Sequence, residues 1–287
     1  MKSKIEKTLD LERVDTDIFV GPIVESHFIR TFGGQIAAQT LVAATQTVDS
    51  DHTVHSLHGY FIRPGKAELQ TVFLVERIRD GRSFVSRQVK AVQEGKPIFI
   101  MQASFHRRGD SGIEHADRMR TVPSAEELPE GPLESMNDTY RALLEEWSDW
   151  DIRVVPPERY QHNPYTPSQQ VVWFRAKDKL PDDETFHICT LTYMSDMTLL
   201  QSALVPHPHV DVQEASLDHA MWFLRPFRAD EWLLYDQVSP SAANGRALTQ
   251  GKIFDSAGNL VAIATQEGLT RILKDGTSPV PMTNLKG

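Results

Sequence analysis

An acid, Asp196, occupies a position where a repeated pattern in this chain carries a glycine in its other copy. The string FLRP at 223–226 is similar to FIRP at 61–64, about 162 positions upstream, and similarity at a fixed offset indicates a duplicated structural unit. Counting 29 residues back from Arg63 reaches Gly34, and counting 29 back from Arg225 reaches Asp196, so the repeat aligns these two positions. A duplicated scaffold with a charge on one side only predicts a single active site between two pseudo-equivalent halves. A carboxylate there could orient a water molecule or remove its proton.

Two other polar residues, Ser216 and Gln266, fall on predicted strands of the second half. Ser216 begins the strand SLDHAMWF, and Gln266 on the last strand aligns with Ala103 of the first half. Taken alone, both are typical of ordinary strand positions, and an aspartate at a helix start is typical of an N-cap. A structural cap would be useful in both halves, however, and only one half has the acid.

Two glycines, Gly33 and Gly34, precede the apolar segment QIAAQTLVAATQTV, which predicts a buried helix over about 34–48. Glycines there let a ligand or another backbone approach the free amides of the first helical turn. Those amides favour partial negative charge, so we expect one of them to polarise a carbonyl group. A second helix is predicted over 196–205, with Asp196 at its start.

The elements that position these residues also occur twice. Strands are predicted at 54–62, 69–78, 83–92 and 97–105, and again at 171–177, 216–224, 232–239, 246–255 and 260–270. A short helix and a strand are expected within 3–20, and a helix at 133–150 within a proline-rich connector. The order of elements predicts an N-terminal repeat at 1–106, a linker at 107–170 and a C-terminal repeat at 171–287.

The composition excludes several classes of function. The net charge of −9 leaves no basic surface for nucleic acid. Cys189 is the only cysteine, which excludes an internal disulfide and a multi-cysteine metal site. The first residues are charged and no stretch approaches the roughly 20 apolar residues of a membrane span. We therefore expect a soluble, cytoplasmic protein without membrane partners.

Histidines cluster in one predicted strand without forming a convincing metal site. His55 points away from His52 and His58, because successive side chains alternate across a strand. For the same reason, the neighbours Asp218 and His219 face opposite sides and do not form a dyad.

Several long strings carry a family resemblance over about 9–271, nearly the whole chain. They are FGGQ, HSLHGYFIRPG, RDGRSF, GKPIFIMQASF, LDHAMWFLRPF and ATQEGLTR. In order and spacing they resemble the acyl-CoA thioesterase II family. This resemblance implies an α+β double hotdog fold, in which two tandem repeats each wrap an antiparallel sheet around a central helix. It also implies hydrolysis of acyl-CoA thioesters, of medium to long chain, to fatty acid and coenzyme A without a metal or cofactor.

The resemblance extends to single residues. Members of the family hold a nucleophilic water with an aspartate, a threonine and a glutamine, which match Asp196, Ser216 and Gln266. Serine departs from the pattern: it keeps the hydroxyl and loses the methyl that restricts threonine, so we expect activity to be retained. The amide of Gly33 or Gly34 is the candidate for polarising the thioester carbonyl, and His58 is a weaker candidate for a position near the acyl chain.

Two rival functions stay open at this stage. A hydratase or dehydratase acting on acyl-CoA would generally present a histidine with an acid, and the helix entries here offer Gly34 and Asp196. A non-catalytic acyl-CoA binding module would bind without turnover.

Basic residues should contact the phosphates of coenzyme A, but the equivalent repeat positions of Arg63 and Arg225 favour a scaffold role for these two side chains. Association into a homodimer or homotetramer is expected.

Overall fold

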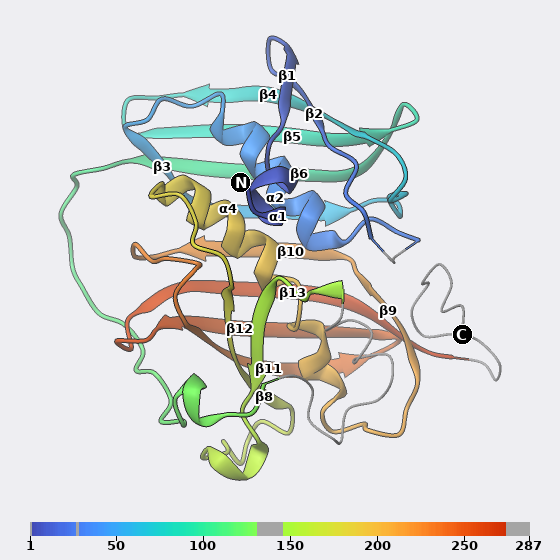
Figure 1. Ribbon diagram of the computed structural model, residues 1–287, viewed down its shortest axis with the longest axis vertical. Helices are drawn as coiled ribbons and strands as arrows, with labels where there is room; N and C mark the ends of the chain where they lie inside the picture. Colours follow the sequence, from blue (N-terminus) through green and yellow to red (C-terminus); the bar gives the residue numbers. More distant parts are fainter. Residues whose placement is uncertain (1, 27–28, 131–145, 274–287) are drawn as a thin grey trace.

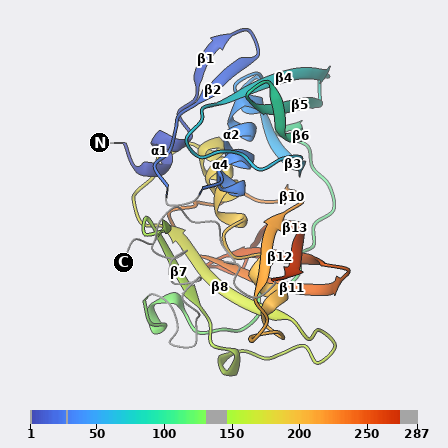
Figure 2. The ribbon, with the colours of Figure 1, turned by 90° about the vertical axis from the view of Figure 1, so that its right-hand side faces the viewer.

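A single antiparallel sheet dominates the computed structural model, which describes residues 2–26, 29–130 and 146–273. Within these residues the sheet has thirteen strands. It curves around two central helices, α2 (Gly33–Thr45) and α4 (Glu184–Ser195), which are in contact with each other. Figures 1 and 2 show the first half of the chain above the second, with the two helices between the curved layers of strands.

The strand order repeats on both sides of the junction between β3 and β10. Reading outward from the junction, the first half contributes β3 (His52–Phe61), β6 (Lys96–Arg107), β5 (Phe84–Gln93), β4 (Thr71–Asp80) and β2 (Ile18–Gly21). The second half contributes β10 (Asp218–Phe223), β13 (Leu260–Ile272), β12 (Arg246–Asp255), β11 (Leu233–Ala243) and β8 (Gln169–Ala176). At the junction His58 pairs with Ala220, its equivalent at the offset of 162, so a pseudo-two-fold axis passes between them.

Shorter strands complete the edges of the sheet. β1 (Glu12–Asp15) and β7 (Trp150–Val154) extend the two ends, and β9 (Val212–Ser216) pairs with β13. The strand predicted at 216–224 is therefore divided at Leu217 into β9 and β10. The sequence did not predict β7, because it lies in the proline-rich connector. Most of the helix predicted at 133–150 lies outside the described residues, and its last residue begins β7.

Helix α2 confirms the helix predicted at 34–48, with an end three residues earlier. Its small and apolar side chains are buried on all sides, which suits a helix at the centre of a sheet. The N-cap, Phe32, has no side chain that could accept from the first amides. Those N–H groups are therefore left for neighbouring groups.

The prediction of a helix beginning at Asp196 was wrong. Helix α4 begins after Asp183, whose Oδ1 accepts from the N–H groups of Thr185 (2.9 Å) and Phe186 (3.3 Å), and Asp196 is its C-cap. A short 3-10 helix, η3 (Leu200–Leu204), follows. Asp183 is a typical N-cap residue, but the buried segment after it, rich in threonine, lacks the amphipathic period that would mark a helix in the sequence.

Other parts of the fold agree with the sequence to within a few residues. The short helix α1 (Lys4–Thr8) is capped by Ser3, and a hairpin of two strands, β1 and β2, follows where one strand was predicted. Among the described residues, no helix is long and apolar enough to cross a membrane.

Candidate active site

The two central strands separate at one end of the junction, and the separation opens a cavity. Their last shared bond runs from the N–H of Phe61 to the carbonyl of Leu217 (2.9 Å). Beyond it, the N–H groups of Ile62 and Arg63 turn to the carbonyl of Ile98 in β6, at 2.8 and 3.2 Å. In the second half of the chain, β9 pairs with β13 instead of with β3. The sheet therefore divides into two lips, one from each half of the chain.

The cavity between these lips has a volume of about 360 Å³. Its apolar walls include Phe32, Ile36, Phe61, Ile62, Ile98, Trp147, Met197, Leu200 and Leu217. The polar residues that line it are Arg30, Thr31, Arg63, Asp196, Gln201, Glu214 and Ser216. A concave, mainly apolar site with a few polar groups is typical of a small-molecule site.

Three predicted site residues, Asp196, Ser216 and Gln266, lie together at this cavity. The hydroxyl of Ser216 donates to Oδ1 of Asp196 at 3.0 Å. Nε2 of Gln266 donates to the same oxygen at 2.5 Å and to Oγ of Ser216 at 2.8 Å. Asp196 and Ser216 face the cavity, whereas Gln266 is fully buried behind them on β13. One amide thus fixes the positions of the carboxylate and the hydroxyl.

The start of α2 meets the carboxylate that follows the end of α4. The N–H of Gly34 donates to the carboxylate of Asp196, and a Cβ on Gly33 would lie only 2.5 Å from its Oδ2. A helix C-terminus disfavours negative charge, but the N-terminus of a second helix favours it. Gly33, unlike Gly34, also lines the cavity.

The pKa of Asp196 reflects opposing influences. Burial is the largest and raises the pKa, since the ionised form loses hydration. The proximity of His219 and the hydrogen bonds from Gln266, Ser216 and Gly34 lower it. The balance leaves the pKa above the ordinary aspartate value, which makes the carboxylate a stronger base than one in water.

Two buried polar atoms near this group have no hydrogen-bond partner among the described residues. They are Oε1 of Gln266 and Nδ1 of His219, which lie on the adjacent strands β13 and β10. The other ring nitrogen of His219 lies 2.8 Å from Oγ of Ser195, and burial lowers the pKa of the ring. Buried polar atoms without a partner are rare in folded proteins, and here both lie next to the carboxylate of the candidate site.

His58 lies away from the cavity. Its side chain is exposed on β3, and Nε2 is 2.9 Å from the carboxylate of Asp218. Asp218 in turn accepts from the N–H of Glu267 at 2.7 Å. The structure therefore does not bring His58 together with Asp196. Among the described residues, no three potential ligand side chains are grouped as a metal site would require.

Sequence analysis missed one acid of the cavity, Glu214. Nε2 of Gln201 donates to its Oε2 at 3.1 Å, and burial raises the pKa of Glu214 to about 7. Strand alternation could have revealed it, because Glu214 precedes Ser216 by two residues and shares its face of β9.

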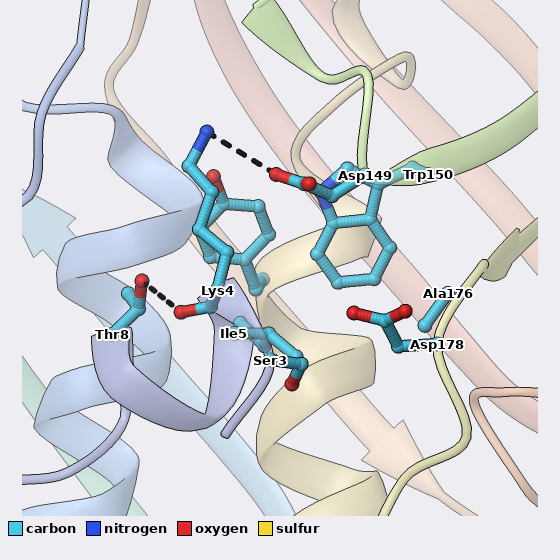
Figure 3. A pocket seen from close by; sticks show the side chains of 9 residues that line it. Ser3, Lys4, Ile5, Thr8, Asp149, Trp150, Ala176 and Asp178 are labelled. Atoms are coloured by element: carbon cyan, nitrogen blue, oxygen red, sulfur yellow. Dashed lines mark hydrogen bonds and ion pairs between the residues drawn. The ribbon is translucent and has the colours of Figure 1, made fainter. Parts of the chain in front are cut away.

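A second, much smaller hollow lies beside α1 (Figure 3). Lys4 reaches the carboxylate of Asp149 at 3.3 Å, and Trp150 and Asp178 lie nearby. The hydroxyl of Thr8 donates to the carbonyl of Lys4 within the helix (2.9 Å). These contacts join the N-terminal helix to the second half of the chain, so the hollow is a structural junction.

Comparison with known proteins identifies the family. Residues 144–269 match the family described as acyl-CoA thioesterase, and residues 25–106 match the acyl-CoA thioesterase N-terminal domain. Over 285 residues the chain is 39% identical to acyl-coenzyme A thioesterase 8 of Homo sapiens, covering 93% of this chain and 89% of that protein. The chain belongs to the acyl-CoA thioesterase family. The family resemblance noted in the sequence is therefore confirmed, and the protein is a thioester hydrolase.

Solved structures agree with this assignment. Acyl-CoA thioesterase II TesB2 of Mycobacterium marinum is 53% identical and superposes with a TM-score of 0.85, covering 95% of this chain and all (100%) of that one. A hot dog fold protein of Alicyclobacillus acidocaldarius, 18% identical, has a TM-score of 0.79 over 96% of this chain and 100% of its own. The thioesterase therefore has the hotdog fold.

Proposed function

We propose that this thioesterase hydrolyses acyl-CoA thioesters to a fatty acid and coenzyme A, using a water molecule activated by Asp196. The observation that carries the proposal is the position of this carboxylate. It lies on the wall of the cavity, at the contact between α4 and α2, and accepts from Ser216, Gln266 and the main chain of Gly34. The names of the relatives support the substrate class.

In the proposed reaction Asp196 accepts a proton from water as the water oxygen forms a bond to the thioester carbonyl carbon. The resulting tetrahedral intermediate collapses when the carbon–sulfur bond breaks and its electron pair leaves with the thiolate. The proton held by Asp196 then passes to that thiolate. A thiolate is a good leaving group, so the reaction needs neither a metal nor a separate acid. The raised pKa of Asp196 supports its role as the base.

The neighbouring groups have distinct roles in this proposal. Nε2 of Gln266 and Oγ of Ser216 hold the carboxylate in the position from which it activates the water. Gly33 lines the cavity at the first turn of α2, and its N–H would stabilise the carbonyl oxygen as it gains charge. The N–H of Gly34 is already directed to Asp196.

The repeated strand order supports the finer inference of a double hotdog, with repeats at 1–106 and 171–287 joined by a linker at 107–170. The apolar walls of the cavity support acyl chains of medium to long length as substrates. A homodimer or homotetramer, and a cytoplasmic location, stay predictions from the sequence.

The test is release of free thiol from saturated acyl-CoA esters of short, medium and long chain, by the parent protein and by Asp196→Asn. Loss of the base should lower kcat by about 10²–10⁴-fold. Asp178→Asn, at the second hollow, is the matched control and should retain activity. Equal activity in the parent and in Asp196→Asn would sink the assignment of the base, and no thiol release by the parent would sink the proposed function.

A further inference from the structure

Two arginines that the repeat makes equivalent, Arg63 and Arg225, share a structural role. Nη1 of Arg63 donates to the carbonyl of Pro97 at 2.8 Å, and Nη1 of Arg225 donates to the carbonyl of Leu260 at 2.9 Å. Each bond ties the turn after a central strand to the adjacent strand. If scaffolding were their whole purpose, the surroundings of the two side chains would also match.

The surroundings differ, because only Arg63 lines the cavity. It follows Phe61 by two residues, on the lip that the first half contributes. A second arginine, Arg30, lines the same cavity and comes from the segment before α2. Both side chains are exposed, and neither forms an ion pair within the part of the chain that the structure describes. Two exposed guanidinium groups without an ion-pair partner among the described residues therefore line one cavity of a protein whose net charge is −9.

The acids of the cavity come from the second half of the chain, whereas both arginines come from the first half. Glu214 and Ser216 belong to the lip formed by β9, and Asp196 follows α4 of the same half. Anionic groups of a substrate would be repelled by Glu214 and Asp196 and attracted by Arg30 and Arg63. The cavity therefore offers cationic groups to the anionic end of a substrate and a carboxylate to its reacting end.

We propose that Arg30 and Arg63 bind the phosphate groups of the coenzyme A half of the substrate, while the thioester lies at Asp196. This inference rests on the proposed function. Coenzyme A carries a pyrophosphate and a 3′-phosphate at the far end of its pantetheine arm, and guanidinium groups bind phosphates through paired hydrogen bonds. The bond to Pro97 holds the Arg63 side chain in place and leaves its other N–H groups available, which reduces the entropy lost on binding.

The experiment compares three thioesters with the same acyl group: acyl-CoA, acyl-3′-dephospho-CoA and acyl-pantetheine, which has no phosphate at all. The variants are Arg63→Gln and Arg30→Gln, with Arg225→Gln as the matched control. Each cavity variant should lower kcat/KM for acyl-CoA about tenfold, mainly through KM, since a hydrogen bond to a charged group contributes roughly 1.5 kcal/mol. Activity on acyl-pantetheine should change less than about twofold. The 3′-dephospho substrate shows which phosphate each arginine binds.

Two results would overturn this inference and leave the thioesterase function intact: an unchanged kcat/KM for acyl-CoA, or an equal loss with acyl-pantetheine. A loss as large in Arg225→Gln would also overturn it, because it would indicate the shared scaffold role. Direct binding of adenosine 3′,5′-bisphosphate, measured by calorimetry, does not depend on hydrolysis. It should weaken in Arg30→Gln and Arg63→Gln, and binding equal to that of the parent protein would contradict the assignment even if no thioester is hydrolysed.

Discussion

A single methyl group added to Gly33 should displace the proposed base without changing its chemistry. A Cβ on Gly33 would lie 2.5 Å from Oδ2 of Asp196, whereas ordinary contacts begin at 3.4 Å, so the carboxylate would have to retreat by about 0.9 Å. The ring of Phe61, at 3.1 Å, would have to move by only a few tenths of an ångström. A misplacement of roughly 1 Å at a reacting group can lower the rate about 10²-fold. We therefore expect Gly33→Ala to lower kcat about a hundredfold.

The stability of Gly33→Ala should change little. Gly33 is the first residue of α2 and its φ does not lie in the left-handed region, so alanine fits the backbone. Alanine is favoured over glycine in helices by up to about 1 kcal/mol, which offsets part of the strain at Asp196. The assay pairs kcat for acyl-CoA hydrolysis with the melting temperature, and Gly112→Ala, where an added Cβ meets nothing within 4 Å, is the control. A folded Gly33→Ala with kcat within threefold of the parent would refute the idea that contact with the helix start sets the position of Asp196.

Two further predictions concern the other polar side chains of the cavity. Ser216→Ala removes the hydroxyl that donates to Asp196 and should lower kcat/KM about 10–100-fold, whereas Ser216→Thr should keep activity near that of the parent. Equal kcat/KM in the parent, Ser216→Ala and Ser216→Thr would exclude a role for the hydroxyl. Burial raises the pKa of Glu214 from 4.5 to about 7, so the folded protein holds this proton more tightly than the unfolded chain. The contribution of Glu214 to the free energy of unfolding is therefore greatest below pH 4.5 and falls as the pH rises to 7, by at most about 3 kcal/mol. Urea unfolding at both ends of this range should show that Glu214→Gln gains stability relative to the parent at the higher pH. If the free energy of unfolding of the two proteins changed equally with pH, the raised pKa of Glu214 would be contradicted.

Much of the fold was predictable because its strands are marked by alternating apolar residues and by turn dipeptides. The family resemblance also predicted that Asp196, Ser216 and Gln266 act together, and the structure brings them within hydrogen-bonding distance, while their catalytic role stays a proposal. The limits of α4 were not predictable from periodicity, because a helix buried on all sides has no polar face. The arginines at the opening could not be assigned either. Arg63 and Arg225 look identical in sequence, and only the division of the sheet beyond Phe61 separates their surroundings.

The difference between Gly34 and Asp196, which first suggested one site for two halves, has a geometric cause. The pseudo-two-fold axis passes between His58 and Ala220, and equivalent positions close to such an axis face each other. Gly34 and Asp196 share the repeat offset of 162 in the sequence and are in contact, since the N–H of Gly34 donates to the carboxylate of Asp196, although Gly34 lies in the first turn of α2 and Asp196 caps the end of α4. A Cβ on Gly34 would lie within 2.6 Å of the Phe32 ring and closer still to the carbonyl of Tyr193, so no side chain fits there. A second acid at the axis would also place two carboxylates against each other, which disfavours ionisation of both. In the proposed mechanism duplication therefore produces one site, in which the first half supplies the helix start and the second half supplies the acid.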